Sequence, residues 1–83
     1  MYFKFLTGNV IFDRNNTVWR TATGRMTPIH FMTTNHINNC ISCLKGEGHT
    51  EIPNPYHGKT KEEWIYIFET ELSIRREENI RIR

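Results

Sequence analysis

The stretch of sequence that decides the fold is residues 19–46, WRTATGRMTPIHFMTTNHINNCISCLKG. It starts with a β-favouring run and a glycine turn, and it continues into a segment with helical periodicity. Apolar residues recur there at the spacing that forms one buried stripe on a helix: Ile37, Cys40, Ile41 and Leu44. We therefore predict a helix over residues 33–45, capped by Thr33 or Thr34 and ended by Gly46 in the left-handed conformation.

Upstream of this helix, short β-favouring runs alternate with turn residues. We predict strands at residues 2–6, 10–12, 17–22 and 25–29. The pair Gly8-Asn9 suits a hairpin between the first two strands, and Asp and Asn residues make a turn of residues 13–16. Pro28 makes the last strand short or places it at a sheet edge.

Downstream of the first helix, residues 47–58 are predicted to form a loop and residues 60–77 a second helix. Thr60 and Glu63 have the spacing of a capping box at its start. Its apolar face is predicted to contain Trp64, Ile65, Phe68 and Leu72, with Ile67 as a further candidate. The tail, residues 78–83, alternates apolar and polar residues, so it either adds a strand to a sheet edge or frays.

These elements predict an α+β fold in one domain over residues 1–83. A small antiparallel sheet of three or four strands in residues 1–30 would pack against the two C-terminal helices. A hydrophobic content of 37% suits a compact fold, but in a chain of 83 residues the core is marginal and homo-oligomers can help to stabilise it.

The composition of the chain limits which cellular location and which classes of partner we expect. The net charge of +2 is too small to identify a nucleic-acid or membrane partner. No signal peptide and no run of apolar residues long enough to span a membrane is evident, so we expect a cytoplasmic protein with no membrane partner. Two cysteines three residues apart on one helix are expected to be reduced thiols.

Part of the chain resembles a known group of proteins. The residues concerned are Trp19-Arg20-Thr21 with Gly24, then Met32 and His36-Ile37-Asn38-Asn39, followed by Ile52-Pro53, Tyr56, the run from Gly58 to Trp64, and Glu71-Leu72. In this pattern the sequence resembles small, mostly uncharacterised proteins of tailed bacteriophages, over most of residues 19–72. The resemblance implies a phage origin and lends no activity.

The loop contains the most unusual local sequence, Pro53-Asn54-Pro55-Tyr56-His57-Gly58. Rigid loops with aromatic residues often carry recognition, whereas the alternative is that Tyr56 only closes the core between the helices. As a partner-binding surface we expect this loop together with the tail, that is Pro53, Pro55, Tyr56, His57, Ile80 and Ile82.

Two other kinds of site are alternatives. A basic sheet face could bind RNA or DNA through Lys4, Arg14, Arg20 and Arg25, with an aromatic side chain stacking on a base. A zinc site could use His36, Cys40, Cys43 and His49, with His57 as another possible fourth ligand. Against zinc, Cys40 belongs to the apolar stripe, where a free thiol packs as a small hydrophobe, so no cofactor is expected.

No nucleophile elbow, phosphate loop or pair of catalytic carboxylates is present, so the chain is not expected to be an enzyme. The function that follows is a phage accessory protein, without catalysis, that binds a host protein or defence factor and inhibits or otherwise modulates it. A small RNA- or DNA-binding module and a small zinc protein are the alternatives.

Overall fold

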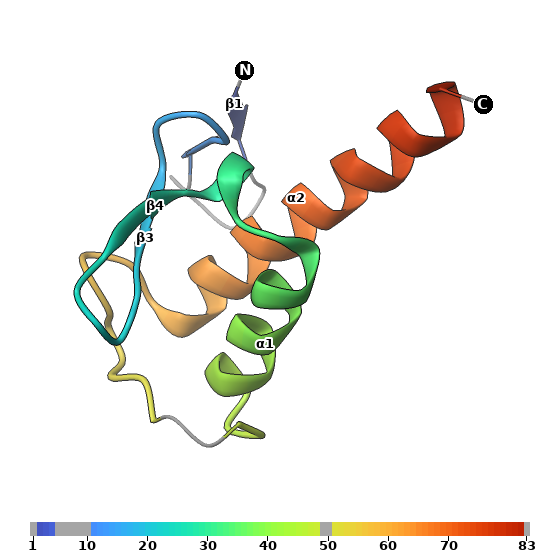
Figure 1. The fold of residues 1–83 in the computed structure, drawn as a ribbon. Coiled ribbons are helices and arrows are strands. Elements are labelled where there is room, and N and C mark those ends of the chain that lie inside the picture. Colours follow the sequence, from blue (N-terminus) through green and yellow to red (C-terminus); the bar gives the residue numbers. More distant parts are fainter. Residues whose placement is uncertain (1, 5–10, 49–50, 83) are drawn as a thin grey trace. The chain divides into compact units, whose positions relative to one another are not determined.

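The computed structural model of the chain describes residues 2–4, 11–48 and 51–82, with the backbone alone for residues 2–4, 11, 81 and 82. Four strands precede two α-helices, so the predicted α+β class is confirmed. The chain divides into two compact units, Met1–Met32 and Thr33–Arg83 (Figure 1). That residues 1–83 act as one domain stays a prediction.

The first unit contains the strands. These are β1 (Tyr2–Lys4), β2 (Ile11–Asp13), β3 (Val18–Arg20) and β4 (Met26–Pro28). β1 pairs with β2 and β3 pairs with β4, both antiparallel, in two separate two-stranded sheets. The prediction of four strands is thus confirmed, whereas their union in one sheet is wrong for the described residues. Among the described residues, β1 pairs only with β2, and β3 pairs only with β4.

The turn between β2 and β3 is held by Asp13, as its sequence indicates. The Asp13 carboxylate accepts hydrogen bonds from the Asn16 side chain (2.7 Å) and from the Asn15 backbone N–H (3.0 Å). These two bonds lower the pKa of Asp13, because they favour its charged form. The Asp13 carbonyl accepts from the Thr17 N–H at 2.7 Å, which closes the turn.

The fourth strand is shorter than predicted. β4 ends at Pro28, and Ile29–Phe31 form a 3₁₀ turn (η1), in which the Met32 N–H donates to the Ile29 carbonyl at 3.1 Å. Pro28, the last residue of β4, has a φ of −58°, which its ring imposes, and a ψ of 142°, so its backbone is still extended and the turn begins at Ile29. The fully or almost fully buried apolar side chains of this unit are Phe12, Trp19, Ile29 and Met32.

The second unit begins with α1 (Thr34–Leu44), which confirms the predicted helix and both of its end signals. Thr33 is the N-cap, and its side-chain oxygen accepts from the His36 N–H at 3.1 Å. Gly46 follows the helix with a φ of +81°, the left-handed conformation that glycine adopts without strain.

The second helix, α2 (Lys61–Ile82), begins as predicted and ends later. Thr60 and Glu63 form the capping box, with the Glu63 N–H donating to Thr60 Oγ1 (3.1 Å) and the Thr60 N–H donating to Glu63 Oε1 (2.8 Å). The helix continues through the predicted tail, so the strand predicted as one alternative for residues 78–82 is wrong, whereas fraying of this end stays a prediction. Arg75 to Glu78 are good helix formers without Gly or Pro, and an established helix propagates through such residues.

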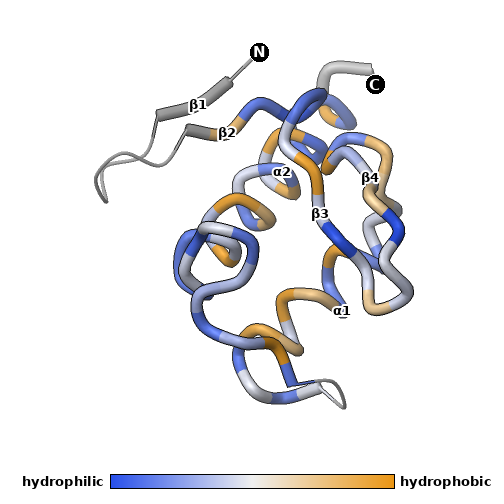
Figure 2. Tube along the Cα trace, turned by 90° about the vertical axis from the view of Figure 1, so that its left-hand side faces the viewer, coloured by the Kyte–Doolittle hydropathy of each residue, from blue (hydrophilic) through white to orange (hydrophobic). Residues whose placement is uncertain are grey.

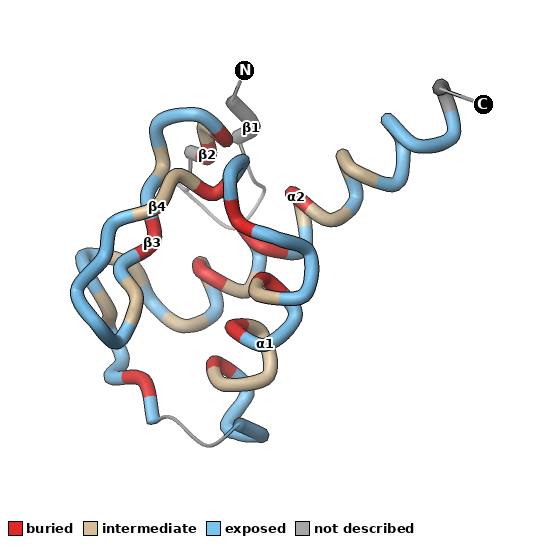
Figure 3. Tube along the Cα trace, viewed as in Figure 1, coloured by how far each residue is buried: buried red, intermediate tan, exposed pale blue. Residues whose placement is uncertain are grey.

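α1 and α2 pack against each other, and this contact organises the core of the second unit. Buried side chains recur along both helices, and the last turns of α2 are exposed (Figure 3). The buried residues are Ile37, Cys40, Leu44, Ile52, Trp64, Ile67, Phe68 and Glu71. Apolar and polar segments therefore alternate along α2 (Figure 2). The predicted face is corrected at Ile65 and Leu72, which are only half-buried, and at Glu71, which it omitted.

The buried carboxylate of Glu71 is paired. Its Oε2 accepts from Arg75 Nε at 2.7 Å, one helical turn further along α2. Arg75 in turn donates from Nη1 to Thr34 Oγ1 at 3.0 Å, so the start of α1 is tied to α2. A charge without solvent contact requires such a partner.

Candidate functional site

The loop before α2 is the best-defined candidate site, and a tight turn forms its tip. The Tyr56 N–H donates to the Lys59 carbonyl (2.8 Å), and the Lys59 N–H donates to the Tyr56 carbonyl (3.2 Å). Between them His57 has a φ of 47° and Gly58 a φ of 82°. Positive φ at both central residues is the signature of a type I′ turn. His57 thereby holds a conformation that costs a residue with a side chain about 1 kcal/mol.

Three contacts brace this loop on α2. Trp64 Nε1 donates to the Tyr56 carbonyl at 2.7 Å, and the Lys61 N–H donates to Asn54 Oδ1 at 3.1 Å. The Lys59 ammonium lies 5.3 Å from the centre of the Trp64 ring, within the range of a cation–π interaction. Because Trp64 is buried, these contacts attach the loop to the core of this unit.

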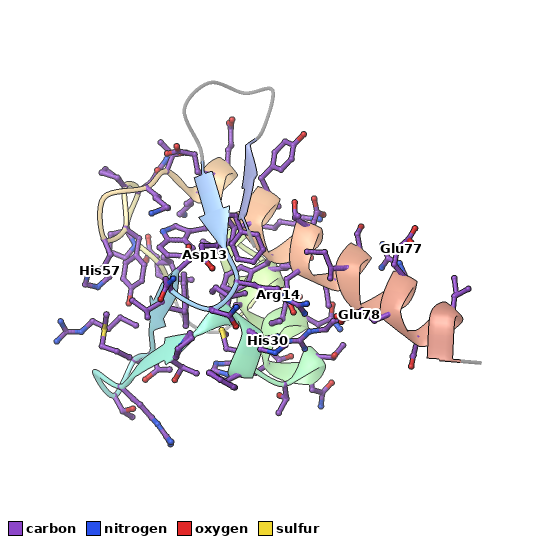
Figure 4. The ribbon with its side chains drawn as sticks, turned by 90° about the horizontal axis from the view of Figure 1, so that it is seen from above. Asp13, Arg14, His30, His57, Glu77 and Glu78 are labelled. Atoms are coloured by element: carbon purple, nitrogen blue, oxygen red, sulfur yellow. The ribbon has the colours of Figure 1, made fainter. Side chains whose placement is uncertain are left out.

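The side chains at the tip remain exposed although the backbone is held. Pro53, Pro55 and His57 are exposed, and Tyr56 is half-buried. The rings of Tyr56 and His57 lie edge to face, with centroids 4.3 Å apart, and His57 projects from the loop (Figure 4). Tyr56 is therefore not part of the buried core, which disfavours the alternative that it only closes the core. The loop presents an ordered pair of rings beside two prolines.

The two isoleucines expected to complete this surface lie elsewhere. Ile80 is on α2 and is 72% exposed, and Ile82 is the last residue of the helix. Ile80 lies 19 residues after the start of α2, which is about 29 Å along the helix at 1.5 Å per residue. Glu77, three residues before Ile80 on α2, accordingly lies at the opposite end of the unit from His57 (Figure 4). The structure therefore does not bring Ile80 together with the loop, and the binding roles of the loop and of the tail stay predictions.

The basic residues expected to form one nucleic-acid face are not equivalent. Arg20 and Arg25 are exposed, whereas Arg14 is only 6% exposed and its carbonyl accepts from the His30 N–H at 2.8 Å. Arg14 and His30 lie side by side in Figure 4. The side chain of Lys4 lies outside the described residues. Arg14 is therefore not part of an exposed basic face, because its side chain is buried.

The zinc alternative finds no support in the described residues. Cys40 is buried in the stripe of α1, as its core interpretation predicted, while His36 and Cys43 are half-buried and His49 lies outside the described residues. Within the described part of the chain, no three His, Cys, Asp or Glu side chains are grouped so that they could hold a metal ion.

Burial gives Cys40 a testable pH signature. Desolvation, with a smaller contribution from the charge of Cys43, raises the pKa of the Cys40 thiol from 9.0 to about 12. Between pH 9 and 12 the Cys40 thiol therefore stays protonated in the folded state, whereas it is deprotonated in the unfolded state. As pH rises from 9 towards 12, the Cys40 contribution to the free energy of unfolding should fall by about 1.4 kcal/mol per pH unit.

This slope is measured by urea unfolding at several pH values, with Cys40→Ala as the control that lacks it. At pH 8, iodoacetamide should modify Cys43 in the folded protein and Cys40 only after unfolding. Equal modification of both thiols in the folded protein would contradict the buried position of Cys40.

Comparison with known proteins found no family model, no curated protein and no solved structure that matches the chain. Neither α1 nor α2, within the residues described, combines the length and apolar character that crossing a membrane requires.

Sequence reasoning placed the loop but missed two of its braces. Asn54 lies seven residues before Lys61, beyond the capping position that Thr60 occupies, so local capping rules do not predict the bond that it accepts. The bond from Trp64 to the loop could not be anticipated, because an apolar position at helical spacing predicts burial alone.

Proposed function

We propose that the protein is a phage-encoded accessory protein that binds a host protein in the host cytoplasm through the loop of residues 53–59 and modulates that protein without catalysis. The resemblance described above supports the phage origin. This origin favours a host protein as the partner, because a phage protein made inside the host cell meets the host's own proteins there.

One observation carries the proposal: the backbone of the loop is held while its side chains are presented. The Trp64 bond to the Tyr56 carbonyl and the Lys61 bond to Asn54 fix the backbone. Pro53, Pro55 and His57 stay exposed on it. A loop that is already ordered loses little conformational entropy on binding, which raises affinity for a matching surface.

The test compares three variants with the wild type. His57→Gly removes the imidazole and suits the positive φ, and Tyr56→Ala removes the second ring and leaves the carbonyl that accepts from Trp64. Ile80→Ala is the matched control, because it truncates an exposed apolar side chain at the other end of α2. Partners are captured from a bacterial lysate, and the candidate is then purified and titrated by calorimetry with each folded variant.

The purified partner should bind wild type and Ile80→Ala equally. Its affinity for the loop variants should fall about 30-fold, since truncating a central aromatic contact costs about 2 kcal/mol. Retained affinity in both loop variants, or a loss confined to Ile80→Ala, would overturn the assignment of the loop.

A further inference from the structure

The β3–β4 hairpin leaves one set of backbone groups directed outward. Trp19 and Thr27 are opposite each other in the register, and hydrogen bonds flank this pair on both sides. They run from the Thr21 N–H to the Arg25 carbonyl and from the Ile29 N–H to the Thr17 carbonyl, each 2.9 Å. Along antiparallel strands, pairs of residues that bond to each other alternate with pairs that do not. The residues of the non-bonded pairs turn their N–H and C=O away from the partner strand. On β4 these residues are Met26 and Pro28.

The outer edge of β4 is therefore open in its two-stranded sheet. The Met26 N–H and carbonyl and the Pro28 carbonyl face this edge, and no hydrogen bond to them is found among the described residues. Met26 is 52% exposed, and residues 22–25 before it are exposed as well. One donor followed by two acceptors is what an added strand needs for its first ladder bonds.

The side chains beside this edge combine apolar surface with positive charge. The register places Val18 opposite Pro28 and Arg20 opposite Met26, so these four side chains share one face. Val18 is 36% exposed, and Arg20 is exposed. Arg25 is also exposed and precedes Met26. Residues 1–32 contain four basic residues and a single acidic one, so an acidic partner complements this unit.

The turn of the hairpin holds the edge in place. The Arg25 N–H donates to Thr21 Oγ1 at 3.1 Å, and the hydroxyls of Thr21 and Thr23 are 3.0 Å apart. Gly24 supplies a φ of +86°, and the Arg20 guanidinium lies over it. The open edge is thus presented on a braced hairpin with cations at its turn end.

We propose that the outer edge of β4 binds an extended segment of a partner protein by strand addition, with apolar side chains on the face of Met26 and acidic side chains at the end of the segment beside the hairpin turn, where Arg20 and Arg25 lie. Backbone bonds to Met26 and Pro28 would set the register, and the carboxylates would fix the direction of the segment. Two arginines beside three apolar side chains suit such a segment better than a nucleic-acid backbone. This proposal does not depend on the loop of residues 53–59.

The test uses the full chain and defined peptides. The probe is the acetylated and amidated heptapeptide Glu-Val-Thr-Val-Thr-Val-Glu, which carries a carboxylate at either end. It is compared with the peptide in which Lys replaces both Glu residues and with the acidic peptide N-methylated at alternate residues. Amide hydrogen exchange followed by NMR should show slowing of about tenfold or more at Met26 with the acidic peptide, and none at Val18 on the other strand. The lysine and N-methylated peptides should bind about tenfold more weakly or not at all.

Two variants separate the backbone from the side chain. Met26→Pro removes the outward N–H and keeps the bonds between β3 and β4, whereas Met26→Ala keeps the N–H and removes the apolar side chain. Binding should be lost in Met26→Pro and weakened about tenfold or less in Met26→Ala. If Met26→Pro does not fold, the N-methylated peptide tests the same bonds on the wild-type chain.

Three results would overturn the proposal. The first is equal binding of the N-methylated peptide. The second is binding of a 20-nucleotide single strand that depends on Arg20 and Arg25 without binding of the acidic peptide. The third is protection of the Met26 amide that grows with protein concentration and needs no peptide, since the edge would then join two copies of this chain.

Discussion

Replacing Trp64 with alanine should lower the free energy of unfolding by about 3–5 kcal/mol, the range for removing a large aromatic side chain from a core. Trp64 is 1% exposed, and its ring stacks on that of Phe68 with centroids 6.0 Å apart. The substitution also leaves the Tyr56 carbonyl without its 2.7 Å donor. The free energy of unfolding of small domains is about 5–15 kcal/mol, so this loss is a large share of the total and should move the urea midpoint of the variant far below that of the wild type.

Urea unfolding followed by circular dichroism measures this effect. Phe68→Ala should show a loss in the same range of about 3–5 kcal/mol, because Phe68 is fully buried. Trp64→Phe is the matched control: it keeps most of the apolar volume, loses the indole N–H, and should cost about 1–3 kcal/mol for the unsatisfied carbonyl. A Trp64→Ala variant with the wild-type urea midpoint would show that the buried face of α2 is assigned wrongly.

The second large effect is expected at Glu71. Glu71→Ala removes a fully buried carboxylate and leaves Arg75, whose side chain is only 20% exposed, without the acceptor of its Nε. Removing one partner of a buried ion pair costs about 3–5 kcal/mol, because the remaining charge stays desolvated. Arg75 would also hold Thr34 less firmly, so the loss should include the contact between the helices.

A double-mutant cycle of Glu71→Ala and Arg75→Ala isolates this pair from the effects of truncation. Urea unfolding of the four proteins should give a coupling energy of about 1–3 kcal/mol, the range for contacting residues in one network. The exposed pair of Lys45 and Glu69, 3.9 Å apart, is the comparison and should give less than about 1 kcal/mol. A Glu71–Arg75 coupling no larger than this comparison would contradict a buried, desolvated pair.

Elements fixed by neighbouring residues could be predicted, and those that depend on distant contacts could not. Thr33, Thr60 and Glu63 act within four residues of themselves, so the helix starts follow from local sequence. Glu71 sits inside an apolar stripe, and its burial depends on a partner one turn away and on α1. Ile80 and Ile82 alternate with polar residues over too few positions to outweigh the helix that precedes them. The separation of the strands into two hairpins likewise depends on which edges meet in space.

The candidate site divides in the same way. The prolines, Tyr56 and His57 stand out in the sequence because their residue types are unusual together, and they are exposed or half-buried in the loop as expected. Residue type alone cannot separate the exposed Arg20 from the buried Arg14, since both are arginines next to β-favouring runs. It also cannot show that α2 removes Ile80 from the neighbourhood of the loop.

The bond from Trp64 to the Tyr56 carbonyl has a consequence for how this protein can evolve. One residue supports both the helical core and the backbone of the display loop, so a change in loop length would pull on the residue that the core can least spare. Descendants of this sequence should therefore diversify the loop by exchanging the exposed residues at its tip. Insertions and deletions between Tyr56 and Trp64 should be rare among functional descendants, and selection from a library that varies loop length would reveal this restriction.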